Sequence, residues 1–89
     1  MKAIVTVVGE DRVGIIAAVC VELASYNVNV LDISQTVMEG YFTMMMVVDV
    51  SASPVPLAEL AQKMDEKGKE MGLSIRLQRG DIFKAMHRV

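Results

Sequence analysis

The stretch Val8-Gly9-Glu10-Asp11-Arg12-Val13-Gly14-Ile15-Ile16 is the part of this 89-residue chain from which its fold can be worked out. A run of β-branched residues precedes it and a helical pattern from about Val13 to Tyr26 follows, so it predicts a turn from a strand into a helix. The first turn of a helix has unpaired N–H donors that can receive a carboxylate. Asp11 is the best candidate for the N-cap. The stretch is therefore either a capped turn or a small ligand site.

The spacing of its two glycines, Gly9-x4-Gly14, is also that of a phosphate-binding P-loop. A P-loop continues with Lys and Ser or Thr, which bind the phosphate oxygens and Mg²⁺, whereas Ile15 and Ile16 follow here. The two acidic residues inside the stretch would in addition repel a polyphosphate. These differences argue against a nucleotide-phosphate loop.

Hydropathy patterns predict six elements in the order strand, helix, strand, strand, helix, strand. Glu39-Gly40 predicts a tight reversal between the second and third strands, and Gly72 predicts the end of the second helix. The predicted ranges are about 2–8, 13–26, 28–38, 41–50, 57–71 and 73–78. This order is that of the α+β ferredoxin-like fold (βαββαβ), in which a four-stranded antiparallel sheet carries two helices on one face.

Apolar residues at helical and strand spacing predict the core. The first helix presents on one side Ile16, Val19, Cys20 and Leu23. The run Met44-Met45-Met46 does not predict a metal site, because neighbouring strand residues point to opposite faces and the three sulfurs do not converge. Core packing is predicted for this run of methionines, and a buried packing role is predicted for the single cysteine.

The sheet face opposite the helices is predicted to be apolar in its centre, with Ile4, Thr6, Tyr41, Met45 and Val47. A continuous apolar area of this kind needs a cover. A second copy of the chain is one candidate. Residues 81–89 are the other, since Asp81 can cap a short C-terminal helix that has on one side Ile82, Phe83, Met86 and Val89. A frayed end is the plainer alternative.

Composition limits the class of protein. Eighty-nine residues make one domain, with a predicted core of 2–79 and a tail of 81–89, and so small a domain gains from burial in an oligomer. A net charge of −2 gives no electrostatic reason to bind nucleic acid or an anionic membrane. The chain lacks a bilayer-spanning run, a signal-peptide pattern and a second cysteine. We expect a cytoplasmic protein.

Two other functions fit the residues less well. An RNA-recognition domain shares the order of elements, but it needs a basic residue and alternating aromatics where this chain has Glu39-Gly40-Tyr41-Phe42 and then methionines. An enzyme needs a catalytic or metal-binding cluster, and the only histidine, His87, has no such partners in the pattern. We therefore expect no enzyme activity, no metal, no other cofactor and no nucleic acid.

The motif Gly9-x-Asp11-Arg12-x-Gly14-Ile15, an amphipathic helix and then Asn27-Val28-Asn29-Val30 follow one another in this chain. This succession resembles the ACT domain, a small ligand-sensing module attached to many enzymes of amino-acid metabolism. The resemblance runs from Lys2 to about Arg79. It looks most like the free-standing, single-domain members, in which Asp32-Ile33-Ser34-Gln35-Thr36 and Asp81-Ile82-Phe83-x-Ala85-Met86 are also familiar.

The resemblance implies a homodimer, or a higher homo-oligomer, in which the first loop of one chain faces the start of the second strand of the other. An amino acid or similar metabolite would bind between them. Backbone N–H groups near Gly14 and Ile15 would hold the ligand carboxylate, and Gly9 is also expected in the ligand site. Asp11 would hold an ammonium group or merely cap the helix. Arg12 would either face solvent or contact the interface or the ligand carboxylate.

Asn29 would offer its amide to the ligand, and Asn27 ranks below it because asparagine also suits the end of a helix. The apolar side of the ligand site would be lined by Val28, Val30 and Leu31. The residues expected at the dimer interface are Val28, Leu31, Tyr41 and Met45. The predicted function is a regulatory module that binds a small molecule, with the regulated enzyme or regulator on a separate chain. A ligand-independent structural or protein-interaction module is the alternative.

Overall fold

The computed structural model describes residues 1–80. Within this range the elements follow the predicted order, and their bounds are β1 Lys2–Glu10, α1 Ile15–Ser25, β2 Asn29–Met38, β3 Tyr41–Asp49, α2 Leu57–Met71 and β4 Ser74–Arg79. The helix predicted for 81–89, with Asp81 as its cap, lies outside the described residues. No helix within 1–80 is long and apolar enough to cross a membrane.

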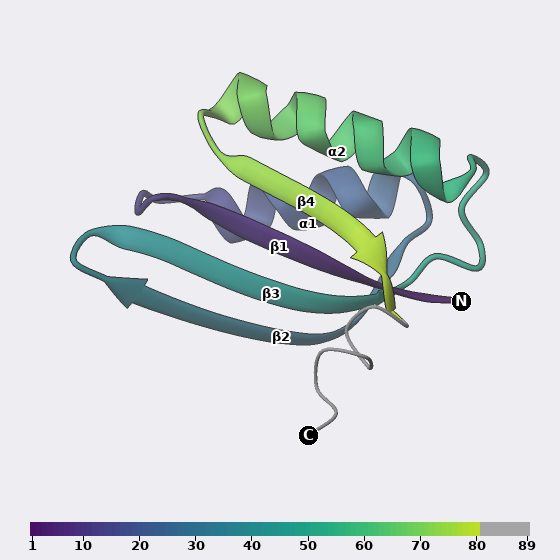
Figure 1. The fold of residues 1–89 in the computed structure, drawn as a ribbon, viewed down its shortest axis with the longest axis horizontal. Helices are drawn as coiled ribbons and strands as arrows, with labels where there is room; N and C mark the ends of the chain where they lie inside the picture. The colour runs from purple at the N-terminus through teal and green to yellow at the C-terminus, as the bar shows by residue number, and fades with distance from the viewer. Residues whose placement is uncertain (81–89) are drawn as a thin grey trace.

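The four strands form one antiparallel sheet in the order β2-β3-β1-β4. Figure 1 shows α1 behind β1 and α2 above β4. Among residues 1–80, one face of the sheet packs on the two helices and the other face carries no helix. The predicted ferredoxin-like fold is confirmed. Strands β2 and β4 are the two edges, and β1 is held centrally between β3 and β4.

The β2–β3 connection is a two-residue hairpin. Met38 pairs with Tyr41 across the strands, and the two residues between them have positive φ angles, 51° at Glu39 and 81° at Gly40. Positive φ at both central positions is the signature of a type I′ turn, whose twist matches that of the strands. The tight reversal predicted from the Glu-Gly pair is therefore confirmed.

Helix α1 begins two residues later than the sequence predicted, and the side chains that it buries also differ in part from the prediction. Its fully buried residues are Ile15, Val19 and Leu23, spaced four apart on one stripe. Ile16 and Cys20, which were predicted to lie on that stripe, are half-buried and pack at its margin. The start of α1 at Ile15 makes this residue the first buried position of the helix.

Strand β3 alternates as predicted. Met44 and Met46 are fully buried between the sheet and the helices, whereas Met45 is 41% exposed on the open face. The three sulfurs therefore belong to two faces of the sheet. Within residues 1–80 there is also no group of three or more His, Cys, Asp or Glu side chains that could hold a metal ion.

Helix α2 packs closely on β4 through a buried glycine. A Cβ on Gly68 would lie 2.8 Å from the carbonyl oxygen of Leu73 and 3.0 Å from Cγ1 of Ile75. The same glycine carbonyl accepts the Leu73 N–H at 2.7 Å, and Gly72, with φ 74°, turns the chain out of the helix. This is a Schellman ending with a buried apolar residue directly after it.

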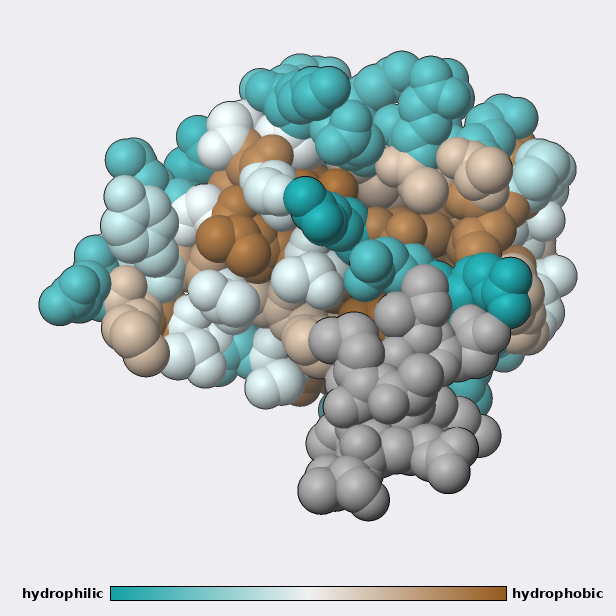
Figure 2. Space-filling view, viewed as in Figure 1, coloured by the Kyte–Doolittle hydropathy of each residue, from teal (hydrophilic) through white to brown (hydrophobic). Residues whose placement is uncertain are grey.

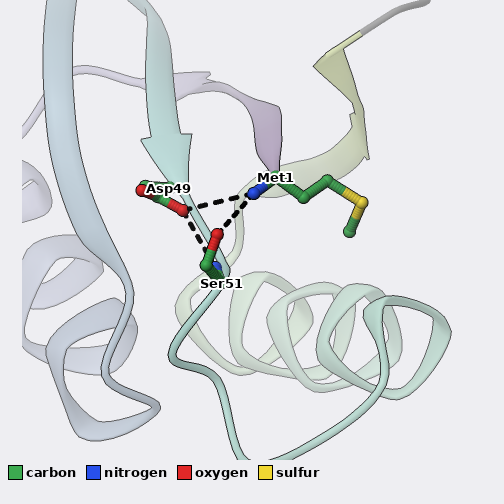
Figure 3. Close-up of polar contacts among 3 residues, drawn as sticks. All are labelled: Met1, Asp49 and Ser51. Atoms are coloured by element: carbon green, nitrogen blue, oxygen red, sulfur yellow. Dashed lines mark hydrogen bonds and ion pairs between the residues drawn. The ribbon is translucent and has the colours of Figure 1, made fainter.

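A polar cluster fixes the end of the sheet where β1 begins (Figure 3). The carboxylate of Asp49 accepts the backbone N–H of Ser51 at 2.9 Å and lies 3.6 Å from the α-ammonium group of Met1, which also donates to the Ser51 hydroxyl. Hydrogen bonds from Ser51, and then the ammonium charge, lower the pKa of Asp49. The ionised carboxylate is therefore favoured in the folded chain.

We expect Gly68→Ala to lower the free energy of unfolding by about 1–3 kcal/mol, because the added methyl group overpacks the α2–β4 contact. Alanine is the better helix former, so helix propensity alone predicts the opposite sign. Urea unfolding with Lys63→Ala, on the exposed side of the same helix, as the control would measure the difference. A Gly68→Ala protein as stable as the control would contradict the close approach.

Asp49 should make folding sensitive to acid. Its pKa is lower in the folded than in the unfolded chain, so its stabilising contribution is complete above the unfolded-state pKa and is lost as the pH falls through the folded-state pKa. We expect Asp49→Asn to flatten the fall of melting temperature with pH below the ordinary aspartate range. Parallel curves for wild type and variant would show that the carboxylate contributes nothing.

Candidate functional site

The N-terminus of α1 is not capped by a side chain. Gly14 is the N-cap residue, in the left-handed region with φ 92°, and within residues 1–80 no side chain caps the helix by a hydrogen bond. The prediction that Asp11 caps this helix was wrong, because the chain turns into the helix at Gly14, three residues further on. Ala18 donates the first intrahelical bond, to the Gly14 carbonyl at 2.9 Å. The N–H groups of residues 15–17 therefore have no partner within the helix.

These N–H groups border a cleft of about 350 Å³. Its lining combines the β1–α1 loop, the first turn of α1 and the side of β2 and β3 that faces the helices. The lining residues are Asp11, Arg12, Gly14, Ile15, Ile16, Ala17, Gln35, Val37 and Phe42. A Cβ on Gly14 would meet nothing within 4 Å, so the glycine leaves this part of the cleft open.

Two backbone contacts hold the β1–α1 loop in place. The N–H of Asp11 donates to the carbonyl of Gly40 at 2.9 Å, which ties the loop to the tip of the β2–β3 hairpin. On the other side Gly9 lies so close to Leu73 that a Cβ would collide with the leucine side chain. The loop is therefore fixed between the hairpin and the α2–β4 connection, while the Asp11 side chain is exposed.

The guanidinium of Arg12 donates a hydrogen bond to the carbonyl oxygen of Met71, the last residue of α2. A cation at this end of a helix also interacts favourably with the helix dipole. Arg12 therefore connects the cleft with the C-terminus of α2, and it does not simply face solvent. An arginine has further donors besides the one used here.

The structure does not bring all predicted site residues together within one chain. Gly14, Ile15, Asp11 and Arg12 line the cleft at the start of α1, and Gly9 lies at the end of β1 beside it. Asn27, Asn29 and Val30 come after α1, and eleven helical residues separate the two ends by about 16 Å. A single chain therefore holds two separate groups of the predicted residues.

Asn27 has a clear local role. Its φ of 58° is left-handed, its N–H donates to the carbonyl of Ala24, and the next N–H, of Val28, donates to Leu23. These two bonds form a Schellman ending for α1. Asn29 is exposed at the start of β2, and Val30 is half-buried.

The residues expected at the dimer interface divide by exposure. Leu31, Tyr41 and Met45 are 46%, 57% and 41% exposed, whereas Val28 is 6% exposed and packs in the core of the domain.

Sequence reasoning missed five residues of the cleft, namely Ile16, Ala17, Gln35, Val37 and Phe42. Gln35 pairs with Met44 and Val37 pairs with Phe42, so these side chains reach the cleft through the strand register. The one available signal was the segment Asp32-Ile33-Ser34-Gln35-Thr36, which was part of the family resemblance.

The chain is similar to known proteins over nearly its whole length. The family model of the ACT domain matches residues 2–78. A UPF0237 protein from Clostridium acetobutylicum is 53% identical over 89 residues, covering 100% of both chains. Another from Methanocaldococcus jannaschii is 44% identical over 88 residues, covering 99% of this chain and 98% of its own.

Solved structures agree with these matches. An ACT domain protein from Streptococcus pneumoniae superposes with a TM-score of 0.83 at 42% identity, covering 98% of each chain. A formyltetrahydrofolate deformylase from Pseudomonas syringae has a TM-score of 0.78 at 25% identity, covering 88% of this chain and 27% of the deformylase. With this fold, this helix N-terminus and these matches, the chain belongs to the ACT domain family.

Proposed function

We propose that this protein is a regulatory module that binds an amino acid, or a close relative of one, at the β1–α1 cleft as a homodimer. ACT domains are regulatory modules that bind small-molecule ligands, and they often form oligomers. The observation that carries the proposal is the cleft itself, where the uncapped N-terminus of α1 lies beside the two charged residues Asp11 and Arg12 and an apolar wall.

The cleft lining matches the chemistry of an α-amino acid. The N–H groups of residues 15–17 and the positive end of α1 suit a carboxylate, with Arg12 beside them. The Asp11 carboxylate is the group for an ammonium ion. Val37 and Phe42 offer an apolar wall for a side chain, and the Gln35 amide offers a polar contact. A volume of about 350 Å³ is at the lower end of small-ligand sites.

A second chain would complete this site. The ten residues of edge strand β2 have one unpaired side, and Leu31, Ile33 and Val37 are exposed along it. Antiparallel pairing of two β2 strands about Ile33 would set Asn29 of the partner subunit beside Val37 at the cleft. This register reunites the two groups of candidate residues that one protomer keeps about 16 Å apart. It also supplies the extra burial that a domain of 89 residues gains from.

Ligand binding would then control assembly. A ligand that binds the dimer and not the separated chains stabilises the dimer by RT ln(1 + [L]/Kd), about 2.7 kcal/mol at a hundredfold excess over Kd. The dimer surface would present this state to a regulated enzyme or regulator. The protein in this role performs no chemistry on its ligand.

Thermal unfolding against the standard amino acids, with sedimentation recorded alongside, tests the proposal. We expect one ligand or a small related group to raise the melting temperature. Gly14→Asp should abolish this rise, because it adds a negative charge where the ligand carboxylate binds. Gly14→Asn is the matched control, since asparagine has the same size and also tolerates the left-handed region. It should retain part of the response.

Unchanged affinity in Gly14→Asp would refute the site. A flat response over the whole panel, together with a stable dimer, would favour the ligand-independent interaction module. The exposed Leu31, Tyr41 and Met45 would then be the residues to test for a protein partner.

The role of Asp11 has its own test, which uses the amino acid identified in the panel and the carboxylic acid that lacks only its amino group. We expect Asp11→Asn to weaken binding of the amino acid by about tenfold, as for the loss of one exposed charge-assisted hydrogen bond, and to leave the carboxylic acid unaffected. Equal losses for both compounds would show that Asp11 does not contact the ammonium group.

A further inference from the structure

Arg12 is in contact with two parts of the molecule at once. It lines the cleft at the start of α1, and its guanidinium donates a hydrogen bond to the carbonyl oxygen of Met71 at the end of α2. The last carbonyl groups of a helix have no partner within that helix, so Arg12 supplies one for Met71. In Figure 1 the turn from β1 into α1 and the end of α2 both lie at the left. The candidate ligand site is therefore joined directly to the α2–β4 connection.

Backbone hydrogen bonds hold the α2–β4 connection. The N–H of Gly72 donates to the carbonyl of Lys69 at 3.2 Å, and the N–H of Leu73 donates to the carbonyl of Gly68 at 2.7 Å. The buried side chain of Leu73 also packs against Gly9, at the end of β1. The strand that leads into the cleft and the α2–β4 connection are thus in contact at a second position.

The hydrogen bond between Arg12 and Met71 lies at the surface. The outer side of α2 is hydrophilic (Figure 2), and Lys69 and Glu70 in its last turn are exposed. Water competes for an exposed hydrogen bond, so this bond contributes little by itself and opens readily. A second partner for the guanidinium would therefore change how much of the time the bond is formed.

The shape of the guanidinium allows both partners at once. An arginine has several N–H donors in a rigid planar fork, and Met71 is bound through Nη2. The donors on Nη1 and Nε can therefore bind a carboxylate side by side. Because Met71 already restrains the side chain, Arg12 loses less freedom when a carboxylate binds. By linkage, a bound carboxylate then stabilises the contact with Met71 by the same factor.

We propose that a ligand carboxylate in the cleft binds Arg12 and thereby stabilises the α2–β4 connection. This rests on the proposed function, because it requires an anionic group of the ligand at that site. Arg12 is then the bridge between the ligand and the end of α2. Strand β4, which follows this connection, is the sheet edge opposite β2. The ligand would therefore alter a part of the surface that lies away from the proposed dimer edge.

Amide hydrogen exchange of Gly72 and Leu73, followed by NMR in the whole chain, tests the bridge first without ligand. We expect Arg12→Gln to speed exchange at both N–H groups, because the connection opens more often once Met71 has lost its partner. The matched control is Arg76→Gln, the same chemical change at an exposed position of β4. It should leave both rates unchanged. Equal rates in the wild type and Arg12→Gln would overturn the proposal.

The second measurement adds an amino acid that raises the melting temperature. We expect exchange at Gly72 and Leu73 to slow by more than at Val28, which is the N–H at the corresponding ending of α1 and corrects for overall stabilisation. Arg12→Lys keeps the positive charge but has no planar fork with which to bridge two acceptors. This variant should still bind the amino acid, and the extra slowing at Gly72 and Leu73 should be lost.

The outcomes separate the bridge from the proposed function. Binding without extra slowing at Gly72 and Leu73, or with faster exchange there, would overturn the bridge and leave the ligand site standing. Extra slowing that persists in Arg12→Lys would also overturn it, because the effect would then not pass through the guanidinium. The absence of binding by any amino acid would overturn the bridge together with the function on which it rests.

Discussion

The pairing of β1 between β3 and β4 is the constraint on which the rest of the structure depends. Glu10 pairs with Tyr41 on one side and Val8 pairs with Ser74 on the other, so β1 ends where the hairpin and the α2–β4 connection also lie. The β1–α1 loop has to leave the sheet between them. The bond from Asp11 to Gly40 and the contact of Gly9 with Leu73 follow from this position. The pairing register of β1 thus places the uncapped N-terminus of α1 beside β2.

The fold could be predicted because its signals are local. Alternation in β3 and the turn residues at 39–40 and 72 each depend on neighbours in sequence, and the structure confirms them. The N-cap of α1 could not be predicted in this way. Whether Asp11 or Gly14 begins the helix depends on where the loop is held, and the hydrogen bond to Gly40 crosses 29 positions. The buried stripe of the helix begins at Ile15 and not at Ile16.

The candidate site divides in the same way. Its helix N-terminus could be found from the glycine spacing, because glycines and a strand-to-helix change are visible in one stretch of sequence. Gln35, Val37 and Phe42 could not, since only strand register brings them to the cleft. The tie between Arg12 and Met71 was equally hidden, because it joins residues 59 positions apart. The type of a residue indicates what its side chain can bind. The pairing of distant segments determines which residues lie next to it in the fold.

The bare edge of β2 has a consequence for how the protein behaves when diluted. Its backbone groups and the exposed Ile33 and Val37 form a template to which any extended chain can add, which is an aggregation hazard for a small domain. The bulge at Leu31 interrupts the regular ladder and limits the length over which a foreign strand can align. If a second copy of the chain pairs with this edge, the stability of the folded protein depends on the protein concentration. The amount of this protein in the cell would then set the fraction of its chains in which the β2 edge is paired.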